Sequence, residues 1–416
     1  MNTKRKWLAG LFVLIGLSQS ILASEIVFQS TQELVEYGIR HNAQLQSKQA
    51  LWKAAQEQPK SLGSLPDPVV GVRLNGSPSK TDGASFDQKR YVASQSFPFF
   101  GELSHLNQLG KGKAESAYLA YLQEKNQLTL SILRMVYSYY LNEELISITS
   151  KNKAVLDNLI NIADVKYQAG LGLQANVLKT KVEKDKFEEE LLSLSHQKTV
   201  ILESLKKLLN VSTASITLQS TYPEKQILSS DNAIDNWVSD TLAIKQAEAM
   251  LTISNSKLIV EKDRYLPNFS AQIEYWDNAA MDNQYGGQIM MTVPWFNSKN
   301  SASVDEAKHQ KQASVATLED MRAKIRAGLT TLVSEIQTTD KTLQLYDDSL
   351  LKHARLALSN FQKAFEVDKA SFIDYFEAEQ TVFQLEKHYA MQKNRYFTAL
   401  ATLTWQFEKG ELPDEQ

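Results

Sequence analysis

The chain has 416 residues, among them nine prolines, 16 glycines and no cysteine. Its formal net charge of -3 and pI near 6.1 lack the basic surplus with which proteins bind phosphates, so nucleic acid is excluded as a partner. The missing cysteine leaves no group for disulfides or for a lipid-modified N-terminal cysteine.

Residues 1–24 have the pattern of a secretory signal peptide. Three cationic residues at 4–6 precede an apolar run at 7–17, and small residues follow near Ala23 and Ser24, where we expect cleavage. A membrane-spanning helix is the alternative, but the run is shorter than the roughly 20 residues that a bilayer requires. The sequence therefore predicts an exported protein.

The remaining chain repeats itself. The motif LPDP at 65–68 returns as LPNF at 266–269, SFPFFG at 96–101 returns as TVPWFN at 292–297, and YQAG at 167–170 is echoed by FEVD at 365–368. The offsets are about 201, 196 and 198 residues, which predicts two tandem copies of one unit. We assign repeat 1 to 25–215, an irregular linker to 216–237, repeat 2 to 238–410 and a tail to 411–416.

Each repeat is expected to begin with a helix and to continue with a β-hairpin, at about 68–98 in repeat 1 and about 268–294 in repeat 2. In these segments apolar and polar residues alternate with the period of a strand. The second strand of the first hairpin, near Tyr91 and Ala93, is the weakest. The residues predicted on the apolar, lipid-facing side are Val70, Val72, Leu74, Phe269, Ile273, Tyr275, Ile289, Met291 and Val293.

A long helical hairpin follows each β-hairpin, at about 101–209 and about 298–408. No proline interrupts the chain from Gly101 to Tyr167, and apolar residues recur every three or four positions. Such a segment approaches about 100 Å if it is one helix. Coiled-coil packing explains these stripes, so we assign them no cofactor role.

The hairpins leave two readings open. They could form an amphipathic sheet on a soluble core, but no other strands are predicted to complete one. A closed transmembrane barrel would remove their open edges, with apolar side chains toward outer-membrane lipid. Four strands cannot close a barrel, whereas three chains supply twelve. The predicted fold is therefore mostly α with a small β part: a long antiparallel coiled-coil barrel plus four transmembrane strands per chain, completed as a homotrimer.

This arrangement resembles the TolC-type outer-membrane efflux family. The resemblance is carried by the doubled motifs at 65–68 and 266–269, at 97–101 and 293–297, and at the helix turns 167–178 and 365–377. The first two motifs and the short length look most like the heavy-metal branch, the cobalt-zinc-cadmium or copper-silver exporters. The resemblance implies an exit duct in the outer membrane with helices in the periplasm, served by a periplasmic adaptor protein and an inner-membrane pump of the resistance-nodulation-division type.

The resemblance also implies roles for residues at the helix turns. Gly170 and Gly172 permit a tight turn between helices, and in the family this turn contacts the adaptor, so docking is expected at Gly170, Leu171, Gly172 and, in the second turn, Asp368. The second turn, at 365–368, departs from the glycine pattern.

Asp374 and Glu377 match the family positions that form acidic rings at a periplasmic gate. They lie three residues apart, on one helical face. Solvated surface positions are the alternative for these two residues, and solvation is the preferred interpretation for the nearby Glu379. The corresponding residues of repeat 1 are Asn176 and Lys179, so a gate would differ between the repeats.

No catalytic residue, metal site or cofactor is predicted. The histidines lack the close spacing of metal ligands, and no nucleophile with a base stands out. Alternatives to a metal-exporting duct are an exit duct for drugs or secreted proteins and, as a different class, a soluble periplasmic coiled-coil scaffold. The six histidines are His41, His105, His196, His309, His353 and His388.

Overall fold

The structure is a computed structural model that describes residues 25–75, 78–79, 83–84, 88–212, 215–218, 221–223, 234–278, 282–294 and 298–407. The predicted signal peptide, the C-terminal tail and residues 295–297 of the second strand-exit motif lie outside these ranges.

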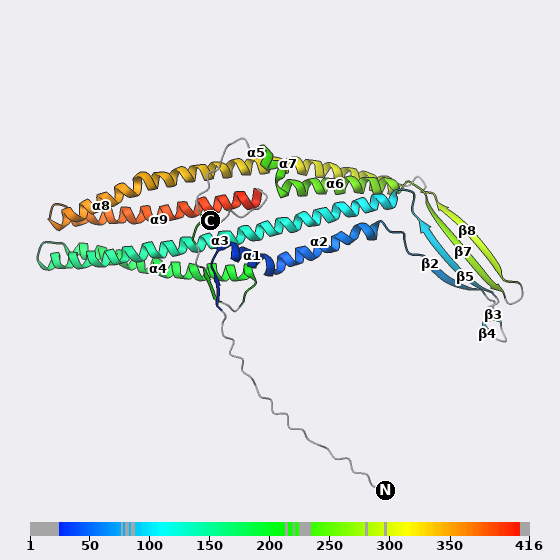
Figure 1. The fold of residues 1–416 in the computed structure, drawn as a ribbon, viewed down its shortest axis with the longest axis horizontal. Coiled ribbons are helices and arrows are strands. Elements are labelled where there is room, and N and C mark those ends of the chain that lie inside the picture. Colours follow the sequence, from blue (N-terminus) through cyan, green and yellow to red (C-terminus); the bar gives the residue numbers. More distant parts are fainter. Residues whose placement is uncertain are drawn as a thin grey trace, which may run out of the picture.

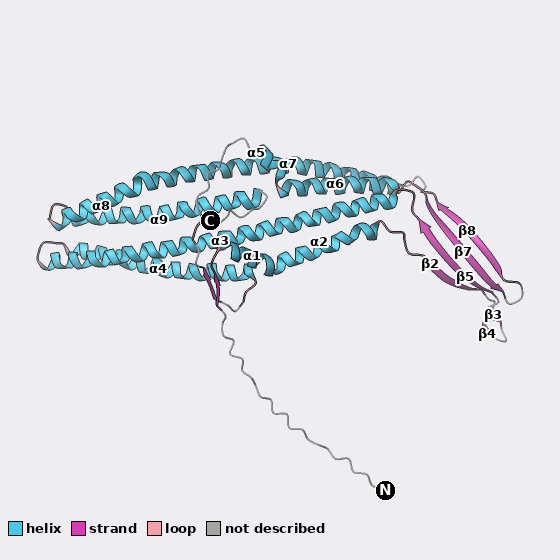
Figure 2. Cartoon of the chain, in the orientation of Figure 1, coloured by secondary structure: helices cyan, strands magenta, loops and turns pink. Residues whose placement is uncertain are grey.

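The molecule is a long helical body with a β-sheet at one end (Figure 1). The helices run along the long axis, and the turns that connect them in pairs lie at the end opposite the sheet (Figure 2). The predicted class, mostly helical with a small β part, is therefore confirmed for the chain. Among the described helices, none is both long enough and apolar enough to cross a bilayer.

Repeat 1 contains two short helices, a pair of long strands and a long helical hairpin. Capping fixes where the first helices begin: the Ser30 side chain accepts from the Glu33 N–H at 3.1 Å, and Asn42 accepts from the Leu45 N–H at 2.9 Å. The elements are α1 (Thr31–His41), α2 (Ala43–Leu62), β2 (Val69–Asn75), β5 (Gln88–Phe97), α3 (Glu102–Gln168) and α4 (Gln174–Leu209).

Repeat 2 has the same order, with one interruption. A π-helical turn, η2 (Tyr346–Leu350), divides the long outgoing helix, which in repeat 1 is the single 67-residue helix α3. The other elements are α5 (Ile234–Asp240), α6 (Leu242–Asp263), β7 (Asn268–Asn278), β8 (Gln284–Thr292), α7 (Ser298–Leu345), α8 (Leu351–Glu366), α9 (Phe372–Thr402) and η3 (Leu403–Phe407).

Four strands form one antiparallel sheet in the order β2-β5-β7-β8. The pairing of β5 with β7 joins the two repeats, with Tyr91 opposite Tyr275 and Phe97 opposite Phe269. The hairpin ends of these strands point away from the helices (Figure 1), where a small ladder of β3 (Pro78–Ser79) and β4 (Gly83–Ala84) is added.

The segment expected to be an irregular linker has regular structure at both ends. Its beginning lies in β6 (Ser215–Leu218), which pairs in parallel with β1 (Glu25–Phe28), and its end forms α5. Phe28 and Ile216 from this pair are buried in the main core. Strands of only four residues carry too little alternation to be recognised, and burial of these two side chains stabilises them.

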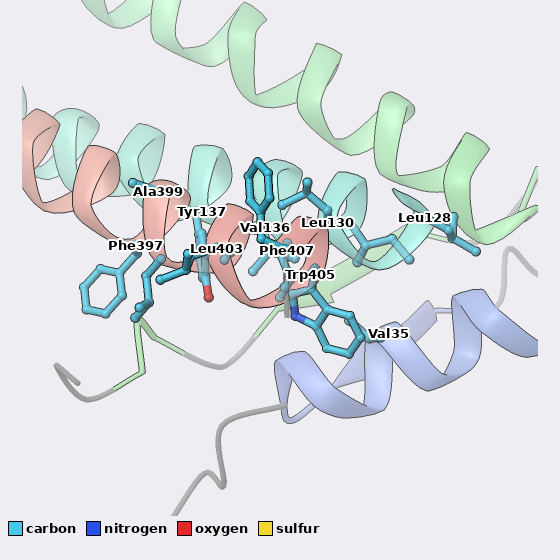
Figure 3. Packing of buried hydrophobic residues seen from close by; sticks show 14 of the residues in the cluster. Val35, Leu128, Leu130, Val136, Tyr137, Phe397, Ala399, Leu403, Trp405 and Phe407 are labelled. Carbon is cyan, nitrogen blue, oxygen red and sulfur yellow. The ribbon is translucent and has the colours of Figure 1, made fainter. Parts of the chain in front are cut away.

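The main core packs α1 and the end of α9 against the middle of α3 (Figure 3). There Val35 of α1, Leu130 and Val136 of α3, Phe397 of α9 and Trp405 of η3 belong to one buried cluster. A second cluster lies nearer the helix turns and holds the hairpins of the two repeats together. In it the rings of Phe187 and Phe383 have centroids 4.5 Å apart. Burial of large apolar side chains thus fixes both hairpins along their length.

Candidate functional site: helix tips, acidic residues and the two-faced sheet

The two helix turns have the same backbone conformation. Gly170 has a φ of 75° and Asp368 a φ of 59°, both in the left-handed region. In the first turn the Leu171 N–H donates to the carbonyl of Lys166 at 2.8 Å, and in the second the Lys369 N–H donates to that of Ala364, also at 2.8 Å. Both are Schellman-type helix ends. Asp368 therefore occupies the position of Gly170, although the sequence of its turn departs from the glycine pattern.

The turns present apolar side chains to solvent. Leu171 is 76% exposed and Val367 is 61% exposed, and Leu173 and Ile373, which flank the starts of α4 and α9, are also exposed. We call these four residues the tip surface. Gly170 has open space around the position of a side chain, whereas a side chain on Gly172 would crowd Lys166. The predicted docking residues therefore lie at an accessible end of the molecule, and their role remains a prediction.

Lys166 connects the two turns. Its Nζ lies 2.5 Å from Asp368 Oδ1 and 3.4 Å from the carbonyl oxygen of Phe365, and it sits 4.0 Å from the centroid of the Phe365 ring. Lys166 belongs to α3 of repeat 1, and its partners belong to repeat 2. One lysine thus joins both tips through an ion pair, a hydrogen bond and a cation–π contact.

Asp374 and Glu377 are both exposed near the start of α9. Asp374 also caps this helix: its Oδ2 accepts from the Ser371 N–H at 3.0 Å and from the Ser371 hydroxyl at 2.7 Å. The Ser371 Oγ in turn accepts from the Asp374 N–H at 3.2 Å, which completes a capping box. These hydrogen bonds, first the one from the Ser371 side chain, lower the pKa of Asp374. These hydrogen bonds therefore favour the anionic form of Asp374.

Repeat 1 brings a cation to the same end. Lys179, which corresponds to Glu377, lies with its Nζ 4.8 Å from the Phe376 ring centroid. The acidic pair of repeat 2 therefore has no acidic counterpart in repeat 1, as the sequence indicated.

Glu379 was interpreted as a solvated position, and this is wrong. Only 6% of the residue is exposed, and Tyr375, one turn earlier, is buried with it. Burial, and secondarily the charge of Glu386, raises the pKa of Glu379 to about 7. Glu379 is buried because it lies on the apolar face of α9. A charged residue does not count as part of an apolar stripe in the sequence, so the sequence did not indicate this burial.

The strand register brings the predicted apolar residues to one face of the sheet. Val70 lies opposite Ala93, Ala93 opposite Ile273, and Ile273 opposite Gly287, so positions of the same parity align across all four strands. The predicted residues of β2, β7 and β8 share this face, and Val293 directly follows β8. Of these residues Val70, Val72, Leu74, Ile273, Ile289, Met291 and Val293 are exposed.

The opposite face carries a polar group that the sequence analysis did not identify. Arg90 Nη2 lies 3.1 Å from Glu274 Oε2, and the Arg90 guanidinium lies 4.9 Å from the Trp276 ring centroid. Recognising these residues required the strand register, because β5 has the weakest alternation of the four strands.

In the part of the chain that the structure describes, no three histidine or acidic side chains are placed to hold a metal ion. The closest histidine contact is His105 Nδ1 to Asp263 Oδ2 at 2.6 Å, where α3 begins and α6 ends. This pair holds two helices together next to the sheet.

Residues 234–405 match a family model described as outer membrane efflux protein. The description of this family agrees with the predicted location in the outer membrane. A search of curated protein sequences finds no match.

The fold is that of several solved channels. The open state of the outer-membrane channel MtrE of Neisseria gonorrhoeae matches with a TM-score of 0.80 and 14% identity, covering 93% of this chain and 90% of that one. The outer-membrane protein VceC of Vibrio cholerae matches with a TM-score of 0.77 and 14% identity, covering 92% of this chain and 97% of that one. CusC matches with a TM-score of 0.79 and 14% identity, covering 91% of this chain and 92% of that one. Residues 234–405 thus resemble the outer membrane efflux protein family, and over more than nine-tenths of its length the chain has the fold of solved outer-membrane channels.

Proposed function

We propose that three copies of this chain form the exit duct of a tripartite efflux system. The duct conducts its cargo passively from a periplasmic adaptor and an inner-membrane pump to the exterior. The observation that carries this proposal is the sheet with one apolar and one polar face at the end of a helical body. The family match supports it, since the family is one of efflux proteins.

The sheet fits an outer membrane in length and in side chains. The 11 residues of β7 extend about 36 Å, which a tilt of about 40° reduces to about 28 Å, close to the roughly 25 Å apolar band of such barrels. On the apolar face Tyr91, Tyr275 and Tyr285 lie side by side near the hairpin end, and Phe97 and Phe269 lie near the helices. Aromatic rows at both edges of an apolar band are typical of membrane barrels.

The sheet also explains why three chains are needed. Its edge strands β2 and β8 have no partner on their outer sides among the described strands. Pairing β2 of one chain with β8 of the next satisfies both edges and closes twelve strands. The helices would then surround a tunnel in the periplasm, and α3, with 67 residues, spans about 100 Å.

For the cargo we propose heavy-metal cations, on the strength of the sequence motifs shared with that branch and of the acidic pair Asp374 and Glu377. Three copies of this pair around one axis would attract cations. An exit duct for drugs or secreted proteins is the second candidate, because a duct of this kind takes its specificity largely from the pump. Adaptor docking is assigned to the two turns, at Gly170, Leu171, Gly172 and Asp368, together with the rest of the tip surface.

Detergent-extracted protein tests the duct. We expect a trimer by light scattering with detergent correction, and discrete conductance steps after insertion into planar bilayers. A protein that remains a water-soluble monomer without detergent would refute the duct. The cargo is tested separately, by expressing the gene in a strain that lacks its own metal-efflux duct: restored zinc or copper tolerance supports metal export, and restored drug tolerance alone contradicts it.

A further inference from the structure

One row of side chains crosses the polar face of the sheet near its hairpin end. Arg73 of β2 lies opposite Arg90 of β5, Arg90 lies opposite Trp276 of β7, and Trp276 lies opposite Gln284 of β8. We call these four residues the arginine row. Directly opposed residues in antiparallel strands have Cβ atoms about 4.5–5.5 Å apart, so the two arginines are neighbours.

Arg90 is fixed within this row. Its side chain is 27% exposed, and its ion-pair partner Glu274 is 10% exposed. Gln272 also donates a hydrogen bond to Glu274. A side chain on Gly286 would lie 2.6 Å from the Trp276 ring, so Trp276 lies against the bare backbone of β8 while its ring contacts Arg90. Glycine at position 286 thus leaves space for the Trp276 ring, and this ring packs against the Arg90 guanidinium.

The polar face has a net positive charge. In the described strands the ionisable residues on this face are Arg73, Arg90 and Glu274. The single glutamate is paired with Arg90, so the charge of Arg73, whose side chain is exposed, is left in excess. On the apolar face, by contrast, Lys89 lies opposite Asp277, and their charges balance.

We propose that the arginine row forms an anion-binding ring inside the barrel, close to its outer opening. This inference rests on the proposed function, because it requires that the polar face line the lumen. Arg73 and Arg90 of each chain offer two adjacent guanidinium groups, which suit the carboxylate, sulfate or phosphate group of a passing solute. Arg90 is positioned by Glu274 and Trp276, and Arg73 supplies the uncompensated charge.

The ring gives the two ends of the duct opposite charges. The acidic pair on α9 lies at the tip end of the molecule, and the arginine row lies at the opposite end (Figure 1). A cation that has entered past the acidic residues meets no attraction at the outlet, and external cations are repelled from it. Anionic solutes are favoured at the outlet instead, and the ring slows free cations equally in both directions.

Reversal potentials in a KCl gradient across planar bilayers test the ring. Three unit charges about 10 Å from a pore axis in ~0.1 M salt raise the anion concentration and lower the cation concentration about twofold each. We therefore expect Arg73→Gln to lower the chloride-to-potassium permeability ratio about fourfold. Arg73→Lys keeps the charge and is expected to keep the wild-type ratio.

Lys89→Gln is the matched control, because Lys89 lies in register with Leu74, next to Arg73, but on the apolar face. We expect it to leave the ratio unchanged. A conducting Arg73→Gln channel with the wild-type ratio would overturn the ring and leave the duct standing. A shift in Lys89→Gln alone would mean that the opposite face lines the lumen, and a wild-type protein without conductance would refute the duct itself.

Discussion

Replacing Glu379 by glutamine tests the cost of a buried carboxylate in α9. Glutamine has nearly the shape of the protonated side chain but cannot ionise. Glu379 lies on α9 within one turn of Tyr375, Phe376 and Phe383, which belong to the second buried cluster, and the carboxylate of Glu386 acts on it as a like charge. Glu386 is itself paired with Arg355 at 2.7 Å, so little positive charge is left to stabilise an anion at Glu379.

The magnitude follows from the pKa. Burial raises the pKa of Glu379 from 4.5 to about 7, and each unit corresponds to about 1.4 kcal/mol, so ionisation costs about 3–4 kcal/mol per chain. Because the folded-state pKa is the higher one, the contribution is fully present below pH 4.5 and is lost as the pH rises to about 7. Glu379→Gln is therefore expected to unfold at a higher temperature than the wild type at pH 8 and at the same temperature at pH 4.5.

Thermal unfolding followed by circular dichroism in detergent, in steps from pH 4.5 to pH 8, measures this difference. The control is Glu377→Gln, two residues away and exposed, for which we expect no such pH dependence. The burial argument would be refuted if the unfolding temperatures of Glu379→Gln and wild type differed equally at pH 4.5 and pH 8, or differed more at pH 4.5.

Three further predictions concern the tips. Asp374→Asn combined with Glu377→Gln is expected to reduce cation selectivity in planar bilayers, because it removes the acidic pair. Gly170→Ala is expected to destabilise the first turn by about 1–2 kcal/mol, seen in thermal unfolding, since alanine must adopt a left-handed φ although space for its side chain is free. Lys166→Gln removes the ion pair between the two tips, and if this contact holds the channel closed, openings in planar bilayers should become more frequent. We expect an increase of at most about fivefold, because Asp368 is 78% exposed and such ion pairs contribute about 0.2–1 kcal/mol.

Two of these predictions have a matched control variant at the tips. Ser371→Ala breaks the capping box but keeps both acidic charges, so unchanged selectivity there, with loss in the double variant, separates charge from helix capping. Asp368→Gly removes the same ion pair as Lys166→Gln without straining the turn. If both variants leave channel opening as in the wild type, the contact between the tips does not hold the channel closed. If Gly170→Ala unfolds like wild type, the turn conformation is not a source of strain.

The sequence predicted features that depend on periodicity. Strand alternation identified the apolar face, and the spacing of buried residues such as Leu156 and Leu159 identified the helical hairpins. Features that depend on which strands become neighbours were missed. Arg73 and Arg90 are 17 residues apart in the chain, and only the register makes them adjacent.

Other features were missed because a residue occurs in an environment that is unusual for its type. Asp368 adopts a left-handed conformation that glycine usually signals, and aspartate does so only occasionally. Glu379 carries a charge that normally marks a solvated position, yet its neighbours on α9 place it inside the hairpin. The tertiary environment, rather than the usual preference of the residue type, determines the backbone conformation of Asp368 and the burial of Glu379.

The π-helical turn η2 makes the two halves of each protomer unequal. In this turn the backbone is wider than in an α-helix, whereas α3 of repeat 1 is one uninterrupted α-helix. The outgoing helices of the two repeats therefore differ in backbone, even though both end in the same turn. In a trimer the six hairpins would alternate between two kinds, so a partner that recognises side chains finds three equivalent places to bind, whereas one that contacts only the shared turn finds six.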